Sequence, residues 1–264
     1  MSAATEARQA ELDRVLDSQE PGRALADELF AVVGLLEAQP TLRRALSDLT
    51  APEEARRQLA AAVLGGQVSA AALTVVQAAA GLRWATSGAL VSALERQGVR
   101  TLFRTAAANG ELDQVEEELF RFSRIVAADH ELRAALEDRA ASLAGRQQLV
   151  AELLDGKALE ITDVLAQRAV RATERTFDLT VEAYLQLAAD QRRRAIAEVT
   201  VARPLTAGQA ERLRAALSAQ VGREVSLQVS VDPAVLGGVR VKLGDEVIEG
   251  TVAGRLQAAE RQLN

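Results

Sequence analysis

The sequence repeats itself internally, because residues 25–66 align with residues 115–156 at a constant offset of 90 without a gap. Glu28 meets Glu118 and Phe30 meets Phe120 at this offset. In both copies apolar residues recur at steps of four, three and four, which draws one buried face on an α-helix. They are Leu25, Leu29, Val32 and Leu36 in the first copy and Val115, Leu119, Phe122 and Val126 in the second. The repeat predicts a duplicated helical unit.

An uncharged run, residues 58–82, is long enough to cross a bilayer as one helix. Its copy at 148–172 carries Glu152, Asp155, Lys157, Glu160, Asp163, Arg168 and Arg171. A charge at the bilayer centre costs roughly 2.5–3.5 kcal/mol, so several of them exclude a span. Because copies are expected to share a fold, we predict two core helices in the first run, with a break at Gly65-Gly66-Gln67.

Start and stop signals divide the first 194 residues into helices. The first expected helix covers residues 3–17, and a second ends near Ala38. A long helix is expected from 85 to 108, where it joins the two copies. Thr50 and Glu53 have the spacing of a capping box, and Ser142 is a second candidate cap.

The pattern changes after Arg194, where alternating segments predict strands. Residues 225–231 alternate as in a half-buried strand, with Val225, Leu227, Val229 and Val231 expected on the buried face. Residues 239–243 alternate as well, with Arg240 and Lys242 expected to face outward. Thr206 and Gln209 predict a capped helix between strands. A turn at Gly244-Asp245, a short strand at 246–249 and a final helix from Thr251 are also expected.

These patterns predict a mostly α fold, in which a duplicated N-terminal helical bundle is followed by a small α+β C-terminal domain. The predicted boundaries are 1–85 for the first helical repeat unit, 86–190 for the second, and 191–264 for the α+β domain.

Composition argues against a catalytic or metal site and against nucleic-acid binding. The chain has no cysteine, one histidine and a net charge of −6, so no thiolate, His-based metal site or basic nucleic-acid face is expected. His130, the acidic run 116–118, the run Arg192-Arg193-Arg194 and Trp84 are interpreted as helix ends or packing. Gly237-Gly238 precedes a strand and lacks a phosphate-loop motif. We predict no catalytic, cofactor-binding or metal-binding residues.

The C-terminal stretch resembles the signature of the delta subunit family of bacterial F-type ATP synthase, to which the mitochondrial oligomycin-sensitivity-conferring protein is related. The matching segments are Val231, Asp232-Pro233, Gly237-Gly238, Val239 to Leu243, Gly244-Asp245, Val247-Ile248 and Glu249-Gly250-Thr251. Glu249 and Thr251 stand where the family usually has Asp and Ser. The chain also exceeds a typical member by about 90 residues, the offset of the repeat, and resembles the longer actinobacterial form.

The resemblance implies a non-catalytic stator subunit of the peripheral stalk, which resists rotor torque during proton-driven ATP synthesis. In the family, the helical domain receives N-terminal segments of the alpha subunits on top of the catalytic head, and the C-terminal domain holds the b-type stalk subunit. The implied location is the cytoplasmic side of the cell membrane, peripheral, through the hetero-oligomeric complex. We hypothesise that residues 86–190 dock on the head, because they are contiguous with the C-terminal domain.

Two other classes of protein fit the sequence less well. A free-standing helical adaptor would stack repeats, but two units are few for such a solenoid. An RNA-binding sheet would present aromatic residues, and residues 195–250 contain none.

Overall fold

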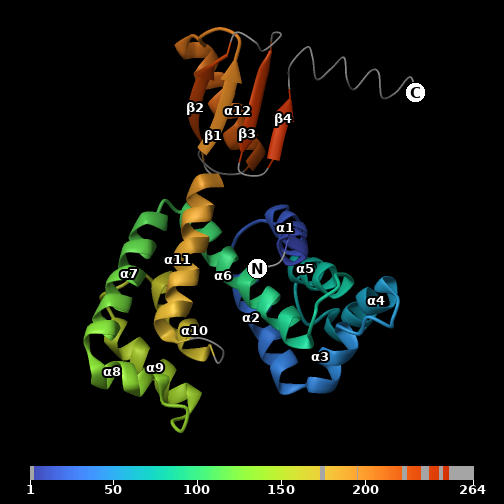
Figure 1. Ribbon diagram of the computed structural model, residues 1–264, viewed down its shortest axis with the longest axis vertical. Helices are drawn as coiled ribbons and strands as arrows, with labels where there is room; N and C mark the ends of the chain where they lie inside the picture. The colour runs from blue at the N-terminus through green and yellow to red at the C-terminus, as the bar shows by residue number, and fades with distance from the viewer. Residues whose placement is uncertain are drawn as a thin grey trace.

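The computed structural model describes residues 3–172, 176–194, 196–221, 225–232, 238–243 and 246–249. Figure 1 shows a helical body at one end and a small sheet at the other, with α11 leading from the body toward the sheet. The prediction of a mostly α fold with a small α+β part is confirmed. The helices of the body are α1 (Ala3–Asp17), α2 (Arg23–Ala38), α3 (Pro40–Leu46), α4 (Glu53–Leu64), α5 (Ala70–Gly81), α6 (Ser87–Ala108), α7 (Leu112–Ala128), α8 (His130–Glu137), α9 (Leu143–Leu154), α10 (Glu160–Arg171) and α11 (Phe177–Arg194).

The duplication is visible helix by helix. At an offset of 90, helices α2, α3, α4 and α5 correspond to α7, α8, α9 and α10. At the same offset, α1 corresponds to the C-terminal part of α6. The first residue of α6 corresponds to Phe177, where α11 begins. Thus α6 is both the last helix of the first unit (α1–α6) and the first helix of the second unit (α6–α11).

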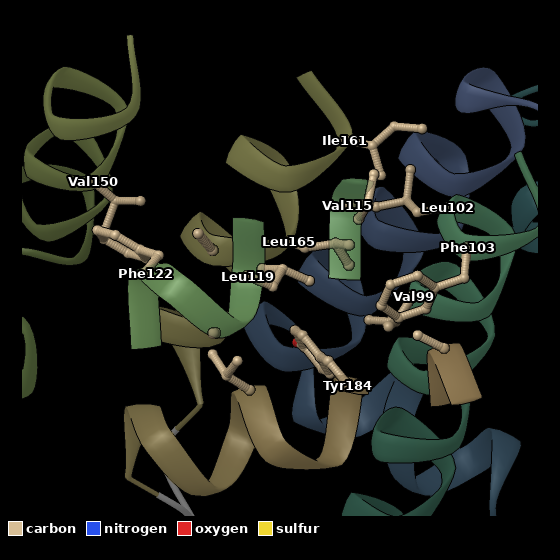
Figure 2. Close-up of a cluster of buried hydrophobic side chains, with 14 of the residues drawn as sticks. Val99, Leu102, Phe103, Val115, Leu119, Phe122, Val150, Ile161, Leu165 and Tyr184 are labelled. Carbon is tan, nitrogen blue, oxygen red and sulfur yellow. The ribbon is translucent and has the colours of Figure 1, made fainter. Parts of the chain in front are cut away.

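The two ends of α6 pack into different cores. Leu90 and Leu94 join a cluster built from α1 to α5, whereas Val99, Leu102 and Phe103 join the core of the second unit. Figure 2 shows these last three side chains beside others of the second-unit core. A continuous helix that is buried at both ends resists bending between the units, because each core must be disrupted before it can move.

Hydrogen bonds repeat with the same spacing as the helices. Glu28 accepts the backbone N–H of Ser69 at 3.1 Å, and Glu118 accepts that of Leu159 at 2.9 Å. In each unit this bond satisfies an N–H at the start of a helix, where no intrahelical partner exists. Arginines repeat as well: Arg56 donates to the carbonyl oxygen of Ala80 at 2.7 Å, and Arg146 donates to that of Val170 at 3.2 Å.

One predicted helix cap is wrong. The Thr50 hydroxyl and backbone N–H both donate to Asp48, at 2.8 and 2.9 Å, so Thr50 belongs to a local turn. Pro52 occupies the N-cap position of α4 and makes no side-chain cap. The competing carboxylate of Asp48 explains the error, because Asp side chains readily bond the backbone two residues on.

Other predicted signals are confirmed. Ser142 accepts the N–H of Gly145 at 3.1 Å, and Thr206 exchanges hydrogen bonds with Gln209 at the start of α12 (Ala207–Val221). Helix α4 ends at Leu64 and α5 begins at Ala70, so the uncharged run is broken as expected. In the part of the chain that the structure describes, no helix has the length and apolarity needed to cross a membrane.

The C-terminal domain has a four-stranded sheet in the order β2-β1-β3-β4. Strand β1 (Ile196–Val201) is parallel to β2 (Ser226–Val231) and antiparallel to β3 (Val239–Leu243), which pairs antiparallel with β4 (Glu246–Glu249). Helix α12 contributes Leu217 to a core with Val199 and Val241.

The predicted faces of this sheet are only partly covered. Arg240 and Lys242 are exposed as expected, and Val225 is buried. Val229 and Val231 are exposed instead, because β2 lies at the edge of the sheet. The predicted turn at 244–245 and the final helix from residue 251 lie outside the described residues.

Candidate partner-binding surfaces

His130 and Trp84, two residues examined in the sequence as possible functional groups, both make contacts within the fold. His130 is exposed at the first position of α8, and its Nδ1 lies 3.4 Å from Nη2 of Arg133. Trp84 is buried, and its indole N–H donates to the carbonyl oxygen of Ala79 at 2.8 Å.

The acidic run 116–118 was expected in the first turn of a helix, but α7 begins at Leu112, so the run lies in the second turn and its side chains are engaged in pairing. Glu116 meets Arg192 at 2.6 Å, and Glu117 pairs with Arg121. Partial burial raises the pKa of Glu118, but hydrogen bonds from the hydroxyl of Thr162 and the N–H of Leu159 outweigh it and leave that pKa below its usual value. An acid held ionised in this way serves as a helix cap and not as a proton donor.

No metal or phosphate site emerges from the described residues. They contain no group of three His, Cys, Asp or Glu side chains placed to hold a metal ion. Gly238 has a φ of +89°, so it bends the chain before β3, while Gly237 lies outside the described residues.

A buried ionic network fastens α1 to α6. Asp13 pairs with Arg96, with Arg100 at 2.8 Å and with the side-chain amide of Gln97 at 2.9 Å. Burial raises the pKa of Asp13, but the hydrogen bond from Arg96 and the charges of Arg100 and Arg96 outweigh it, so its pKa is lowered. The network is structural, since it joins the first helix of the body to the shared one.

Long side chains link helix α2 of the first unit to α10 of the second, with an ion pair near each end. Arg23 meets Glu160 at 3.0 Å near the start of α10, and Glu37 pairs with Arg171 at its end. Opposite charges at two separated points fix the register of these helices.

Between the ion pairs, Phe30 anchors the contact. Its ring is packed against the backbone of Gly98 in α6, where an added Cβ would overlap three ring carbons. The guanidinium of Arg168 in α10 lies 4.2 Å from the ring centroid and also pairs with Glu95 of α6. Phe30 is therefore only 7% exposed.

Phe120, the counterpart of Phe30, has the opposite environment. It is 53% exposed on α7, although the two residues occupy equivalent positions of the repeat. The counterpart of Gly98 is Ala188, a buried residue of α11 that carries a Cβ where Gly98 has none. The sequence prediction missed Phe120 as a surface residue, and the Gly98–Ala188 difference is the signal that could have found it.

Large exposed apolar side chains lie in three places among the described residues. The second unit carries Phe120, Ile125 and Leu179, strand β2 carries Val229 and Val231, and the first unit carries Leu49. Contiguous exposed apolar groups mark surfaces that bind other proteins, so these residues are the candidate contacts in the described part of the chain.

Comparison with known proteins assigns a family. Residues 96–263 match the sequence profile of the family described as ATP synthase delta (OSCP) subunit. A protein of Parafrankia sp. named ATP synthase subunit delta is 46% identical over 242 residues, which is 91% of this chain and 87% of the relative. A protein of the same name from Streptomyces coelicolor is 44% identical over 254 residues, covering 96% of this chain and 93% of the relative.

The family profile and the individual relatives match different lengths of this chain. The family profile begins at residue 96, inside the shared helix α6, and so covers the second unit and the C-terminal domain. The relatives align with nearly the whole chain, as in Rhodococcus opacus, where 41% identity extends over 99% of it. The first unit is thus shared with these relatives, although the profile does not include it.

Proposed function

This chain belongs to the ATP synthase delta (OSCP) subunit family, and on that premise we propose that its helical body docks on the catalytic head while its C-terminal domain holds the b-type stalk subunit. Family membership makes it a non-catalytic subunit of the peripheral stalk of F-type ATP synthase and part of a hetero-oligomeric complex. Its work is mechanical: it keeps the head from turning with the rotor.

The distribution of exposed apolar side chains supports separate binding sites for the head and the stalk. Phe120, Ile125 and Leu179 lie on the second unit, and Val229 and Val231 lie on the sheet of the C-terminal domain. Exposed apolar residues on two separate domains suit a protein that joins two partners, because each attachment raises the effective concentration of the other. The proposed head partners are N-terminal helical segments of the alpha subunits, since helices commonly bind in grooves between helices.

We assign head docking to the second unit, residues 86–190. It is the unit that the family profile covers together with the C-terminal domain. The first unit adds stiffness, because its helix α2 is fixed to α10 by two ion pairs and by Phe30. The proposed domain limits remain 1–85, 86–190 and 191–264, with α6 shared between the two cores.

We further propose attachment at the cytoplasmic side of the cell membrane through the complex. Affinity purification of the full-length tagged chain from solubilised membranes tests the partners. Recovery of alpha, beta and b-type subunits together is expected. Recovery of the chain without them, or with unrelated soluble proteins, would instead favour a free-standing adaptor.

A further inference from the structure

We propose that helix α2 is a structural part of both helical units, and that through it the two units unfold as one cooperative body. By its place in the repeat, α2 belongs to the first unit. The core of that unit takes its side chains Leu25, Leu29, Val32, Val33 and Leu36. Two other buried residues of α2, Ala26 and Phe30, join the core of the second unit, in the same cluster as Val99 and Leu102 of α6. One helix therefore has two buried faces, one for each core.

Helix α7, the counterpart of α2, differs at the positions of this second face. The apolar stripe of α7 is buried in the core of its own unit, as the repeat predicts. Ala26 corresponds to Glu116, which pairs with Arg192. Phe30 corresponds to Phe120, which is exposed. The second face of α2 is therefore a property of its own sequence and is not dictated by the repeat.

The second face is built around the ring of Phe30. Ala26, Phe30 and Gly34 are four positions apart, so they lie on one side of the helix. The ring packs against the backbone of Gly98 in α6, and the guanidinium of Arg168 in α10 lies 4.2 Å from the ring centroid. Loss of the ring would therefore remove contacts with two helices of the second unit at once.

The arginine beside the ring is held in place by the second unit itself. The Nε of Arg168 donates to the carboxylate of Glu95 in α6 at 3.0 Å. At the offset of 90, Glu95 corresponds to Thr5 and Arg168 to Ala78. The first unit thus has neither charge at the equivalent positions. We therefore treat the joint as a device of this pair of units and not as a general feature of the repeat.

Shared helices make the stability of one unit depend on the other. Helix α6 also contributes to both cores, so two helices would have to lose contacts before either unit could open alone. Opening the first unit would expose apolar surface of the second core, which is unfavourable in water. The mechanical meaning of this coupling rests on the proposed function. A body that opens only as a whole does not yield between its units while it resists the rotor.

The chain carries a natural probe in each unit. Its only tryptophan, Trp84, is buried in the first core, and its only tyrosine, Tyr184, is buried in the second (Figure 2). During denaturant unfolding of the full-length chain, the fluorescence of Trp84 follows the first unit. The fluorine NMR signal of a fluorotyrosine incorporated at position 184 follows the second. We expect the two unfolding midpoints to coincide, as in a single cooperative transition.

The test places a cavity in one unit and observes the other. Leu64→Ala removes a buried side chain of the first core, in α4, and is expected to lower both midpoints equally. In a Phe30→Ala background, Leu64→Ala is expected to lower the Trp84 midpoint and to leave the Tyr184 midpoint in place. Phe30→Leu is the matched control, because it keeps an apolar side chain on the second core, and it should keep the two midpoints together.

Two results would overturn the inference. If Leu64→Ala leaves the Tyr184 midpoint unmoved in the otherwise unchanged chain, the units unfold separately. If coupling survives Phe30→Ala, α6 alone joins the units and α2 does not. Should Phe30→Ala fail to fold, Arg168→Gln takes its place, since it keeps the ring, removes the pair with Glu95 and should also separate the midpoints. These measurements need no partner, so their outcome is independent of the affinity purification that tests the proposed function.

Discussion

The ring of Phe30 in α2 lies directly on the backbone of Gly98 in α6, in the space that a side chain at position 98 would fill. This contact, together with Arg168 at 4.2 Å from the ring centroid, joins the two helical units. The body therefore depends on a glycine in the middle of its longest helix, where glycine is otherwise unfavourable.

Replacing that glycine should loosen the joint. Gly98→Ala forces the ring of Phe30 aside, and overpacking of this kind costs about 1–3 kcal/mol, more than the helix gains from alanine. Chemical denaturation of the purified chain measures the change. Gly88→Ala in the same helix is the control, since a Cβ there meets only the Thr86 hydroxyl oxygen at 3.8 Å, and it should be neutral or slightly stabilising.

The two equivalent arginines should differ in importance. Arg56 is buried and donates to the carbonyl oxygens of Ala80, Gly81 and Ala51 at 2.6–2.7 Å. Arg56→Met leaves these oxygens without their charged donor, and we expect a loss of about 2–4 kcal/mol in the free energy of unfolding.

The matched change Arg146→Met should cost less. Arg146 is only half-buried, and its two bonds, to the carbonyl oxygens of Leu136 and Val170, are both 3.2 Å long. Denaturant midpoints of the two variants, measured side by side, check the order. An equal or larger loss for Arg146→Met would refute the ranking by bond length and burial.

Asp13 should make stability depend on pH on the acid side. Its pKa is lowered in the folded chain by Arg96 and Arg100, despite burial. The ionised carboxylate therefore stabilises the fold above its unfolded pKa, near 4, and this contribution disappears as the pH falls through the lower folded value. Asp13→Asn should destabilise the chain at pH 7 and reduce the fall in unfolding free energy below pH 4.

Unfolding free energy is measured against pH for the parent chain and for Asp13→Asn. The difference isolates the contribution of Asp13, because other carboxylates with lowered pKa, such as Glu118 and Asp48, are unchanged in the variant. Glu117→Gln, at an exposed pair, should retain the parent profile. Parallel profiles for Asp13→Asn and the parent chain would mean that Asp13 does not hold its charge more strongly in the folded state.

Much of the fold could be predicted from the sequence because its signals are local. The 3.6-residue spacing of Leu25, Leu29 and Val32 requires only a helix and one covered face, and the strict alternation in 225–231 requires only a strand. The break at Gly65 was predicted for the same reason, since glycine acts on its own backbone.

The features that escaped prediction depend on contacts between distant segments. The sequence similarity of the copies ends at residue 66, and the double role of α6 follows from the packing of its two ends into two cores. Phe30 and Phe120 are identical in sequence and spacing, and their different exposure is decided at positions 98 and 188. Thr50 was misassigned because Asp48 competes for its donors.

The central claim, that this chain couples head to stalk mechanically, is tested most directly in membrane vesicles that contain the purified complex with and without it. ATP hydrolysis and ATP-driven ion transport are measured on the same vesicles. After removal of the chain we expect hydrolysis to continue while transport collapses, and adding the chain back should restore transport. Undiminished transport per ATP hydrolysed in vesicles lacking the chain would contradict the account.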